Sequence, residues 1–99
     1  MYYKITLFEG IDNYTINKNG DIKHLKKNNN IKYLKENNYI FVLLFGRDIS
    51  IKIRFDKLMA LMFIKNPDPN KYKYIRHKDG NPENNKLNNL EWDEPKEDY

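Results

Sequence analysis

Three segments of the sequence predict an α+β fold. Residues 39–45 form an apolar, β-prone run, and residues 49–55 alternate apolar side chains with serine, lysine and arginine. A period of two is typical of a strand with one buried face, so Ile49 and the isoleucines that follow should point inward and the basic residues outward. Residues 57–64 are rich in leucine and methionine and predict a mostly buried helix. We therefore expect a small, mostly antiparallel sheet with one buried helix, in a single domain over residues 1–99.

Short strands and turns are expected around these segments. Asn19-Gly20 tolerates positive φ and predicts a hairpin turn. Asp56 should cap the helix with its carboxylate, and Pro67 and Pro69 should end it. The other expected elements are a strand over residues 2–8, hairpin strands over 14–17 and 21–25, a polar loop over 26–30, a turn over 46–48, closing strands over 72–76 and 90–92 with a turn over 79–82 between them, and about one helical turn after Pro95.

The charge of the chain is unevenly distributed. The net charge is +4, but residues 1–78 hold 16 lysines and arginines against 7 acidic residues, whereas residues 79–99 hold 2 against 7. A basic body attracts a polyanion such as nucleic acid, because lysines that neutralise phosphates release counterions. The acidic end could supply metal ligands. The alternative is that these charges are only solvated surface.

Composition excludes several classes of protein. There is no cysteine, so a disulfide framework and a cysteine zinc site are excluded, and a reducing compartment is suitable. No leader is seen, and the longest apolar run is too short to span a bilayer. We expect a soluble intracellular protein without membrane contact, in the cytoplasm or, if viral, in the cytoplasm or nucleus of a host cell. Runs of asparagine, such as residues 37–38 and 84–85, are interpreted as codon bias, so a single asparagine carries little weight.

The most specific segment is residues 75–92. It contains His77-Lys78-Asp79-Gly80-Asn81, then Asn84-Asn85, then Asn89-Leu90-Glu91-Trp92. This ordered string resembles the signature of the HNH homing endonucleases of phages and introns. The resemblance covers roughly residues 11–98, with an N-terminal hairpin module at 11–25, a strand–strand–helix block at 39–64 and the HNH motif at 72–98. It implies a C-terminal ββα-metal (His-Me finger) hairpin whose final helix is cut short.

The resemblance also implies roles for individual residues. His77 is similar to the general base of the family, and a neutral imidazole can take a proton from water near neutral pH. Asn89 matches the motif asparagine, whose side-chain oxygen would accept the imidazole N–H and orient the ring. We expect the ring to face an open, positively lined groove with the Asn89 amide behind it. Asp98 occupies the last motif position and would help to hold one divalent ion, Mg²⁺ first, with Mn²⁺ or Zn²⁺ as alternatives.

Other residues are expected to shape the loop that follows His77 or to bind DNA. Short polar side chains bond their own backbone in tight loops, and glycine supplies unusual φ. The loop residues are Asp79, Gly80, Asn81, Asn84 and Asn85. Basic side chains on the open strand face and near His77 would contact the phosphates of double-stranded DNA, with no small-molecule cofactor. They are Lys52, Arg54, Lys57 and Arg76.

The sequence departs from the family pattern at three positions. Arg76 stands where the residue before the base is usually a metal-binding Asp or Asn, and arginine cannot ligate a cation. The chain ends one residue after Asp98, and Asp56 stands where the family often has histidine. The lead interpretation is an HNH-type DNA endonuclease or nickase, which would leave a 5′-phosphate and a 3′-hydroxyl. The alternatives are a non-catalytic DNA-binding relative and, more remotely, a protein–protein adaptor.

Overall fold

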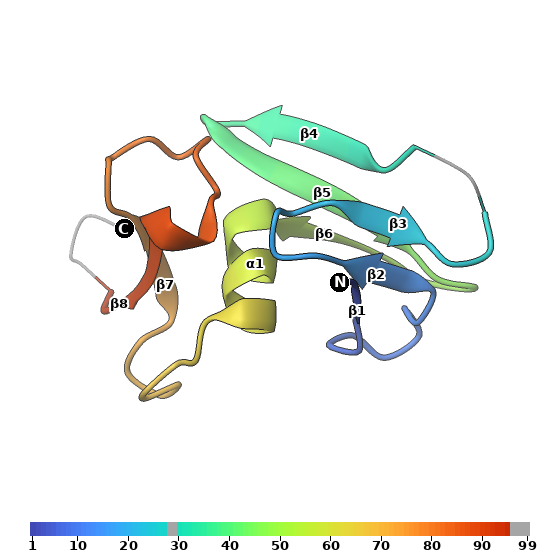
Figure 1. The fold of residues 1–99 in the computed structure, drawn as a ribbon, viewed down its shortest axis with the longest axis horizontal. Helices are drawn as coiled ribbons and strands as arrows, with labels where there is room; N and C mark the ends of the chain where they lie inside the picture. Colours follow the sequence, from blue (N-terminus) through green and yellow to red (C-terminus); the bar gives the residue numbers. More distant parts are fainter. Residues whose placement is uncertain (28–29, 96–99) are drawn as a thin grey trace.

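The computed structural model describes residues 1–27 and 30–95, and these form an α+β fold (Figure 1). The predicted class, with antiparallel pairing and one α-helix among the described residues, is confirmed. The expectation of a single sheet is wrong, because the strands form three separate sheets in the orders β1-β2-β3, β4-β5-β6 and β7-β8. The elements are β1 (Tyr3–Lys4), β2 (Tyr14–Ile16), β3 (Ile22–His24), β4 (Lys32–Glu36), β5 (Tyr39–Phe45), β6 (Ser50–Arg54), α1 (Phe55–Phe63), β7 (Tyr74–His77), the 3-10 turn η1 (Leu87–Asn89) and β8 (Leu90–Asp93).

The N-terminal sheet is shorter than its sequence suggested. The strand expected over residues 2–8 is reduced to the two residues of β1, followed by an isolated bridge between Phe8 and Ile11. The predicted hairpin between β2 and β3 is present, and Gly20 has a φ of +89°. Asn17 organises this turn, since its side-chain oxygen accepts the N–H groups of Asn19 and Asp21 at 3.0 and 2.9 Å.

The second sheet contains a strand that the sequence analysis missed. β4 pairs with the whole first half of β5, from Glu36 opposite Tyr39 to Lys32 opposite Leu43. Asn37 and Asn38 connect the two strands and both have positive φ, +52° and +70°. Asparagine adopts this left-handed conformation more readily than other non-glycine residues, and two-residue hairpin turns require it.

The two faces of this second sheet differ in character. Val42 and Leu44 of β5 are fully buried, and Ile51 and Ile53 of β6 pack against the same core, as predicted. Ile49 is an exception, because it precedes β6 and is 47% exposed. On the opposite face, register places the side chains of β6 beside alternate residues of β5. That outer face carries Tyr39, Phe41, Leu43, Ser50, Lys52 and Arg54.

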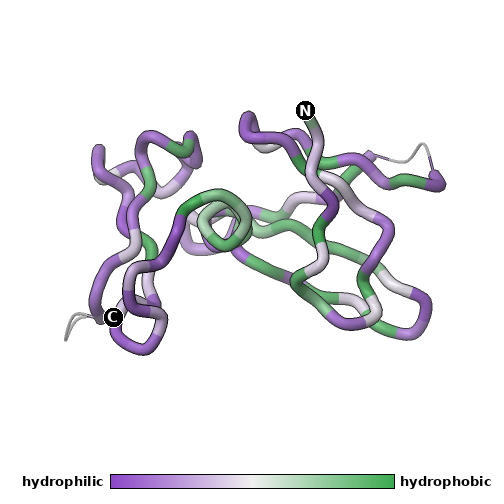
Figure 2. Tube along the Cα trace, turned by 60° about the horizontal axis from the view of Figure 1, so that its bottom comes forward, coloured by the Kyte–Doolittle hydropathy of each residue, from purple (hydrophilic) through white to green (hydrophobic). Residues whose placement is uncertain are grey.

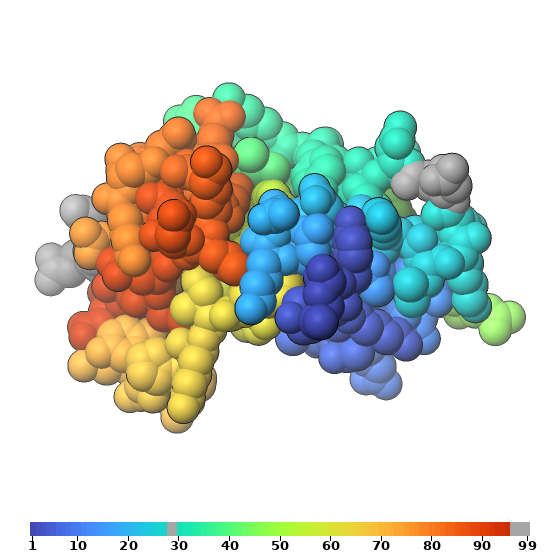
Figure 3. Space-filling model, in the orientation of Figure 1, coloured from blue at the N-terminus to red at the C-terminus, as the bar shows by residue number. Residues whose placement is uncertain are grey.

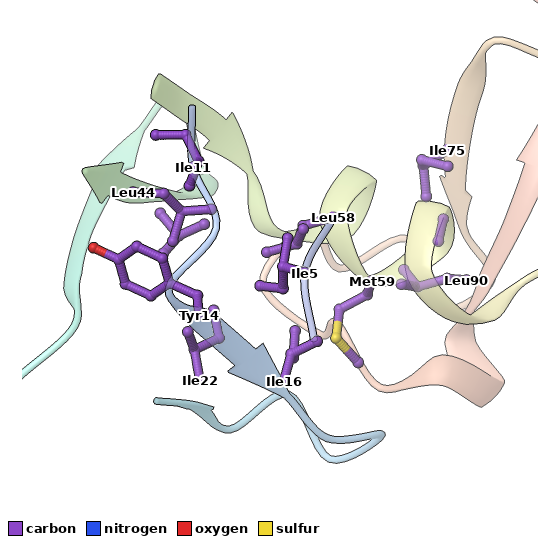
Figure 4. Close-up of a cluster of buried hydrophobic side chains, with 12 residues drawn as sticks. Ile5, Ile11, Tyr14, Ile16, Ile22, Leu44, Leu58, Met59, Ile75 and Leu90 are labelled. Atoms are coloured by element: carbon purple, nitrogen blue, oxygen red, sulfur yellow. The ribbon is translucent and has the colours of Figure 1, made fainter. Parts of the chain in front are cut away.

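Helix α1 is the centre of the molecule. It lies between the two N-terminal sheets and the β7–β8 hairpin, and Figure 2 shows its mostly hydrophobic residues in the middle and hydrophilic loops around them. Leu58 and Met59 are at most 1% exposed, whereas Leu61 is 40% exposed. Figure 4 shows the buried cluster running from Leu44, across Leu58 and Met59, to Ile75 and Leu90.

The beginning of α1 differs from the prediction. The helix starts at Phe55, Arg54 is its N-cap residue, and no side chain caps it. Asp56 therefore lies within the first turn, where a carboxylate is favourable beside the positive end of the helix dipole. Its Oδ1 accepts the N–H of the next residue, Lys57, at 2.6 Å. The predicted capping role of Asp56 is thus wrong, because the N-cap lies two positions earlier, at Arg54.

The C-terminal hairpin packs at one end of the long axis (Figure 3). Ile75 and Leu90 bury one of its faces, and Trp92 donates its indole N–H to the carbonyl of Ile64 at 2.9 Å. The helical turn expected after Pro95 falls on residues 96–99, outside the described part of the chain. Among the described residues, no helix has the length and apolarity needed to cross a membrane.

Candidate active site

The register of β7 and β8 separates the side chains at the end of β7. Arg76 pairs with Glu91, and His77 pairs with Leu90. Because side chains alternate along a strand, His77 and Ile75 face α1 while Arg76 points to the opposite side of the hairpin. His77, the candidate general base, and Arg76 therefore lie on different surfaces of the hairpin.

The His77 ring is held by two oxygen atoms. Its Nε2 lies 3.0 Å from Oδ1 of Asn85 and 3.6 Å from Oδ2 of Asp56. The His77 side chain is 6% exposed and the Asp56 side chain 2% exposed. The expected open groove around the ring is therefore wrong, because the first turn of α1 and the residue 78–86 loop enclose it.

The contact with Asn85 determines the tautomer of His77. An amide oxygen can only accept a hydrogen bond, so Nε2 must donate to it and must carry the hydrogen. A neutral imidazole with its hydrogen on Nε2 has its lone pair on Nδ1. Nδ1 is then the nitrogen that can take a proton from water.

Asn89 does not orient the His77 ring as expected, and bonds to the loop instead. Its side-chain oxygen accepts the backbone N–H of Asp79 at 3.0 Å, and its amide donates to Oδ1 of Asp79 and to the carbonyl of Asn84 at 3.0 and 2.8 Å. None of these three hydrogen bonds is the predicted one to His77. Asn85 makes the contact with the ring instead. Asn89 is buried, and it fixes the loop that delivers Asn85 to the ring.

The other predicted loop residues lie within the same network. Oδ1 of Asp79 accepts the N–H of Asn81 at 2.8 Å, and the Asn81 side chain accepts the N–H of Glu83 at 3.0 Å. Gly80 has a φ of +76°, which a residue with a Cβ adopts only with strain. Asn84 donates its side-chain N–H to Oδ2 of Asp79 at 2.8 Å. Local side-chain bonds therefore give this irregular loop its shape.

These bonds have a consequence for the ionisation of Asp79. The hydrogen bond from Asn84, together with those from Asn81 and Asn89, lowers the pKa of the Asp79 carboxyl below 3.8. A lowered pKa stabilises the folded loop above pH 3.8, and this contribution is lost as the pH falls through the folded value.

We therefore expect Asn84→Ala to raise the pKa of Asp79 back toward 3.8, because it removes the largest cause of the shift. The measurement is a carboxyl-carbon NMR titration of the wild type and the variant. Asn88→Ala, a change at a neighbouring exposed asparagine, is the matched control and should leave the titration unchanged. An unaltered Asp79 titration in Asn84→Ala would contradict the assigned bond.

Asp56 and Arg54 form a paired charge beside the ring. Arg54 donates its Nε and Nη2 hydrogens to the two carboxylate oxygens of Asp56 at 3.1 and 2.5 Å. Burial alone would lower the pKa of Arg54, but the hydrogen bond and the charge of Asp56 outweigh it and the pKa is raised. The guanidinium also stacks over the Tyr39 ring at 3.8 Å from its centroid. Arg54 is therefore a fixed cation and part of the surroundings of His77.

Three of the predicted phosphate-binding residues line one hollow. Lys52, Arg54 and Lys57 surround a depression of about 360 Å³ between β6, α1 and β7, with Asp56 among its walls. Lys52 also pairs with Glu36 at 2.9 Å, and Lys57 donates to the carbonyl of Lys73 at 2.8 Å. Burial lowers the pKa of Lys57. The fourth residue, Arg76, lies on the other face of the hairpin.

The described residues do not assemble a divalent cation site. No group of three or more His, Asp and Glu side chains comes together in residues 1–27 and 30–95. Arg76 donates to Oε1 of Glu91 at 2.7 Å, so the Glu91 carboxylate is already paired with the Arg76 guanidinium. The predicted ligand Asp98 lies outside the described residues.

Two residues near His77 were not recognised from the sequence as partners of the ring. Asp56 was expected to cap α1 and Asn85 to shape the loop. The spacing of the motif contains no signal for Asp56, because 21 residues separate it from His77 and only the fold brings them together. The pairing of Asn85 with the ring depends on the turn geometry of the loop.

Known proteins resemble this chain in sequence and in fold. Two uncharacterized HNH endonucleases of Acanthamoeba polyphaga mimivirus are 35% identical over 95 residues and 31% identical over 85 residues, which is 90% and 85% of this chain. The chain spans only 27% and 21% of the length of these relatives. No family model matches it.

A solved structure has the same fold. It concerns DNA binding and cleavage by the HNH homing endonuclease I-HmuI, and it matches with a TM-score of 0.76 and 23% sequence identity. The match covers 95% of this chain and 52% of that chain. At this level of identity the likeness concerns the fold alone.

Proposed function

Because this chain belongs to the HNH endonuclease family, we propose that it cuts DNA as an endonuclease or nickase, with His77 as the general base. The observation that carries the proposal is the hydrogen bond between Nε2 of His77 and Asn85, which leaves the Nδ1 lone pair available for a proton. The hollow lined by Lys52, Arg54 and Lys57 lies next to Asp56, which contacts the ring, and provides positive charge for a phosphate backbone.

The proposed reaction is hydrolysis of a DNA phosphodiester by water. Nδ1 of His77 takes one proton from a water molecule, and the water oxygen attacks the phosphorus. The bond between phosphorus and the 3′ oxygen breaks, and that oxygen takes a proton from solvent. The products are a 5′-phosphate and a 3′-hydroxyl, as the family resemblance implies. No divalent ion is assigned to this step, because the described residues bring together no group of three or more His, Asp and Glu side chains and Asp98 lies outside them.

The experiment that tests the proposal is nicking of supercoiled plasmid by wild-type protein with Mg²⁺ or Mn²⁺, compared with the same protein in chelator. DNA retention is measured in parallel as a function of salt. Nicking above the chelator control supports the nuclease. Salt-sensitive retention without nicking supports a non-catalytic DNA-binding protein, and loss of retention even at low salt contradicts both.

The second candidate, a DNA-binding relative without catalysis, is favoured by Arg76. A permanently charged guanidinium occupies the strand end, bonded to Glu91, and it repels a divalent ion. The low exposure of the His77 ring also favours this candidate. Under this hypothesis the basic hollow binds phosphates and the remaining motif residues hold the loop.

Arg76→Asp is expected to create a cation site. The new carboxylate would stand directly across the strand pair from Glu91, and opposed side chains of neighbouring strands are close enough to share an ion. We expect Mn²⁺ affinity, measured by calorimetry, to rise about tenfold over wild type. Nicking should stay at the wild-type rate, because this ion would lie on the face of the hairpin opposite His77.

Arg76→Ala is the matched control, since it removes the positive charge without adding a ligand. It should bind Mn²⁺ more weakly than Arg76→Asp. Equal affinities in the two variants would contradict position 76 as a ligand position, and equal affinities in wild type and Arg76→Ala would contradict exclusion of the ion by the guanidinium.

A further inference from the structure

Asp56 is a carboxylate of the first helical turn, and the helix alone does not explain why it is so deeply buried. It is 2% exposed, and an ionised carboxylate is costly to bury unless it is paired. Arg54 supplies the pairing through two hydrogen bonds. The same oxygen that accepts from Nη2 of Arg54, Oδ2, is also the oxygen that lies 3.6 Å from Nε2 of His77.

The surroundings of Nε2 therefore contain one neutral and one charged acceptor. Asn85 approaches from the loop at 3.0 Å, and Asp56 approaches from α1 at 3.6 Å. Both favour a hydrogen on Nε2, since each presents an oxygen to it. The negative charge of Asp56 would also stabilise the positive ring that forms when Nδ1 accepts a proton.

We propose that Asp56, locked by Arg54, is a positioning residue for His77. Together with Asn85 it holds the hydrogen on Nε2, and it thereby orients Nδ1 toward the reacting water. This inference rests on the proposed nuclease function for its effect on rate, but its effect on the tautomer is independent of catalysis. Arg54 then serves the site by fixing Asp56, in addition to any contact with phosphate.

The clamp on Asp56 is itself rigid. The Arg54 guanidinium is bound by both oxygens of Asp56 on one side and stacks on Tyr39, whose ring centroid is 6.4 Å from that of His77. A planar guanidinium held in this way has little freedom, so Asp56 keeps one orientation toward the ring. The helix, the second sheet and the loop thus all contribute a group to the surroundings of one imidazole.

The first test is the tautomer of His77 in wild-type protein, read from long-range proton–nitrogen correlation spectra. The proposal predicts a hydrogen on Nε2 and an unprotonated Nδ1 in the neutral ring. A hydrogen on Nδ1 in wild-type protein would overturn it. This measurement needs no variant and no cleavage, so it separates failure of the inference from failure of the proposed function.

The second test compares Asp56→Asn with Asp56→Glu and wild type. Asp56→Asn is expected to mix the two tautomers and to lower the single-turnover cleavage rate, measured at saturating DNA, about 10- to 100-fold. Asp56→Glu keeps the charge and should recover part of the rate. Asp12→Asn, the same chemical change at an exposed aspartate, is the control and should match wild type.

The outcomes of the second test separate positioning from mere stability. Unfolding curves identify a variant that is not folded under the assay conditions. The His77 spectrum of Asn85→Ala then decides the matter, because Asp56 alone should keep the hydrogen on Nε2 and a shift of the hydrogen to Nδ1 would overturn the proposal. A folded Asp56→Asn protein with the wild-type tautomer and the wild-type rate would overturn the proposal. Loss of rate that Asp56→Glu partly restores, with a changed His77 spectrum, supports it.

Discussion

His77→Ala is expected to slow DNA cleavage by about 10²- to 10⁴-fold, the range for removal of a general base. DNA affinity should change by less than about threefold, because the ring is 6% exposed and offers little surface to a phosphate backbone. The measurement is the initial rate of plasmid nicking beside a gel-shift titration with the same DNA.

His24→Ala is the matched control for this variant. The Nδ1 of His24 accepts the backbone N–H groups of Lys26 and Lys27 at 3.0 Å, so its role is to hold a turn at the other end of the molecule. It should nick DNA at the wild-type rate. Equal nicking by wild type and His77→Ala would show that the activity comes from another residue or from a contaminating nuclease.

Leu58→Ala is expected to lower the free energy of unfolding by about 3–5 kcal/mol. Leu58 is 0% exposed and lies where α1 packs between the sheets and the hairpin. A domain of this size has a total stability of about 5–15 kcal/mol, so the variant should be close to unfolded at physiological temperature. Urea unfolding followed by far-ultraviolet circular dichroism measures the change.

Leu61→Ala is the control on the same helix. Leu61 is 40% exposed, so it should cost less than about 1 kcal/mol. A similar loss in both variants would contradict the placement of α1 at the centre of the core. Because Asp56 lies on α1, partial loosening of the helix by Leu58→Ala should also disturb the His77 spectrum.

The elements with a clear hydrophobic pattern were predictable from sequence. β5 and the helix over residues 55–63 are apolar runs of the expected length, and β6 shows the expected alternation. β4 was missed because its side chains are exposed and its turn consists of asparagines. In a chain so rich in asparagine, the turn signal of Asn37-Asn38 was attributed to composition, although positive φ at both residues is a conformational requirement.

The residues of the site were predictable from sequence, but the contacts between them were not. The sequence placed His77 at a strand end and identified the loop that follows, because ordered polar residues around a glycine have specific local geometry. It did not reveal that Asn85, rather than Asn89, meets the ring. Nor did it reveal that Arg54 pairs with Asp56, because the sequence analysis assigned Arg54 to DNA phosphates and Asp56 to a helix cap.

The separation of Arg76 from His77 follows from strand geometry alone. Adjacent residues on β7 point to opposite faces, so no repacking of the core places both on one surface. The sequence analysis therefore placed one basic residue too many near the His77 ring. Of the four cations expected to contact DNA beside it, three line the hollow on the side of α1 and Arg76 does not.

The chemistry of the cut ends tests the central claim most directly. A nicked plasmid produced by wild-type protein is incubated with DNA ligase without prior kinase or phosphatase treatment. If His77 activates water and the bond to the 3′ oxygen breaks, the nicks carry a 5′-phosphate and a 3′-hydroxyl, and ligase will reseal them. Nicks that ligase cannot seal, or wild-type nicking no greater than that of His77→Ala, would contradict the account.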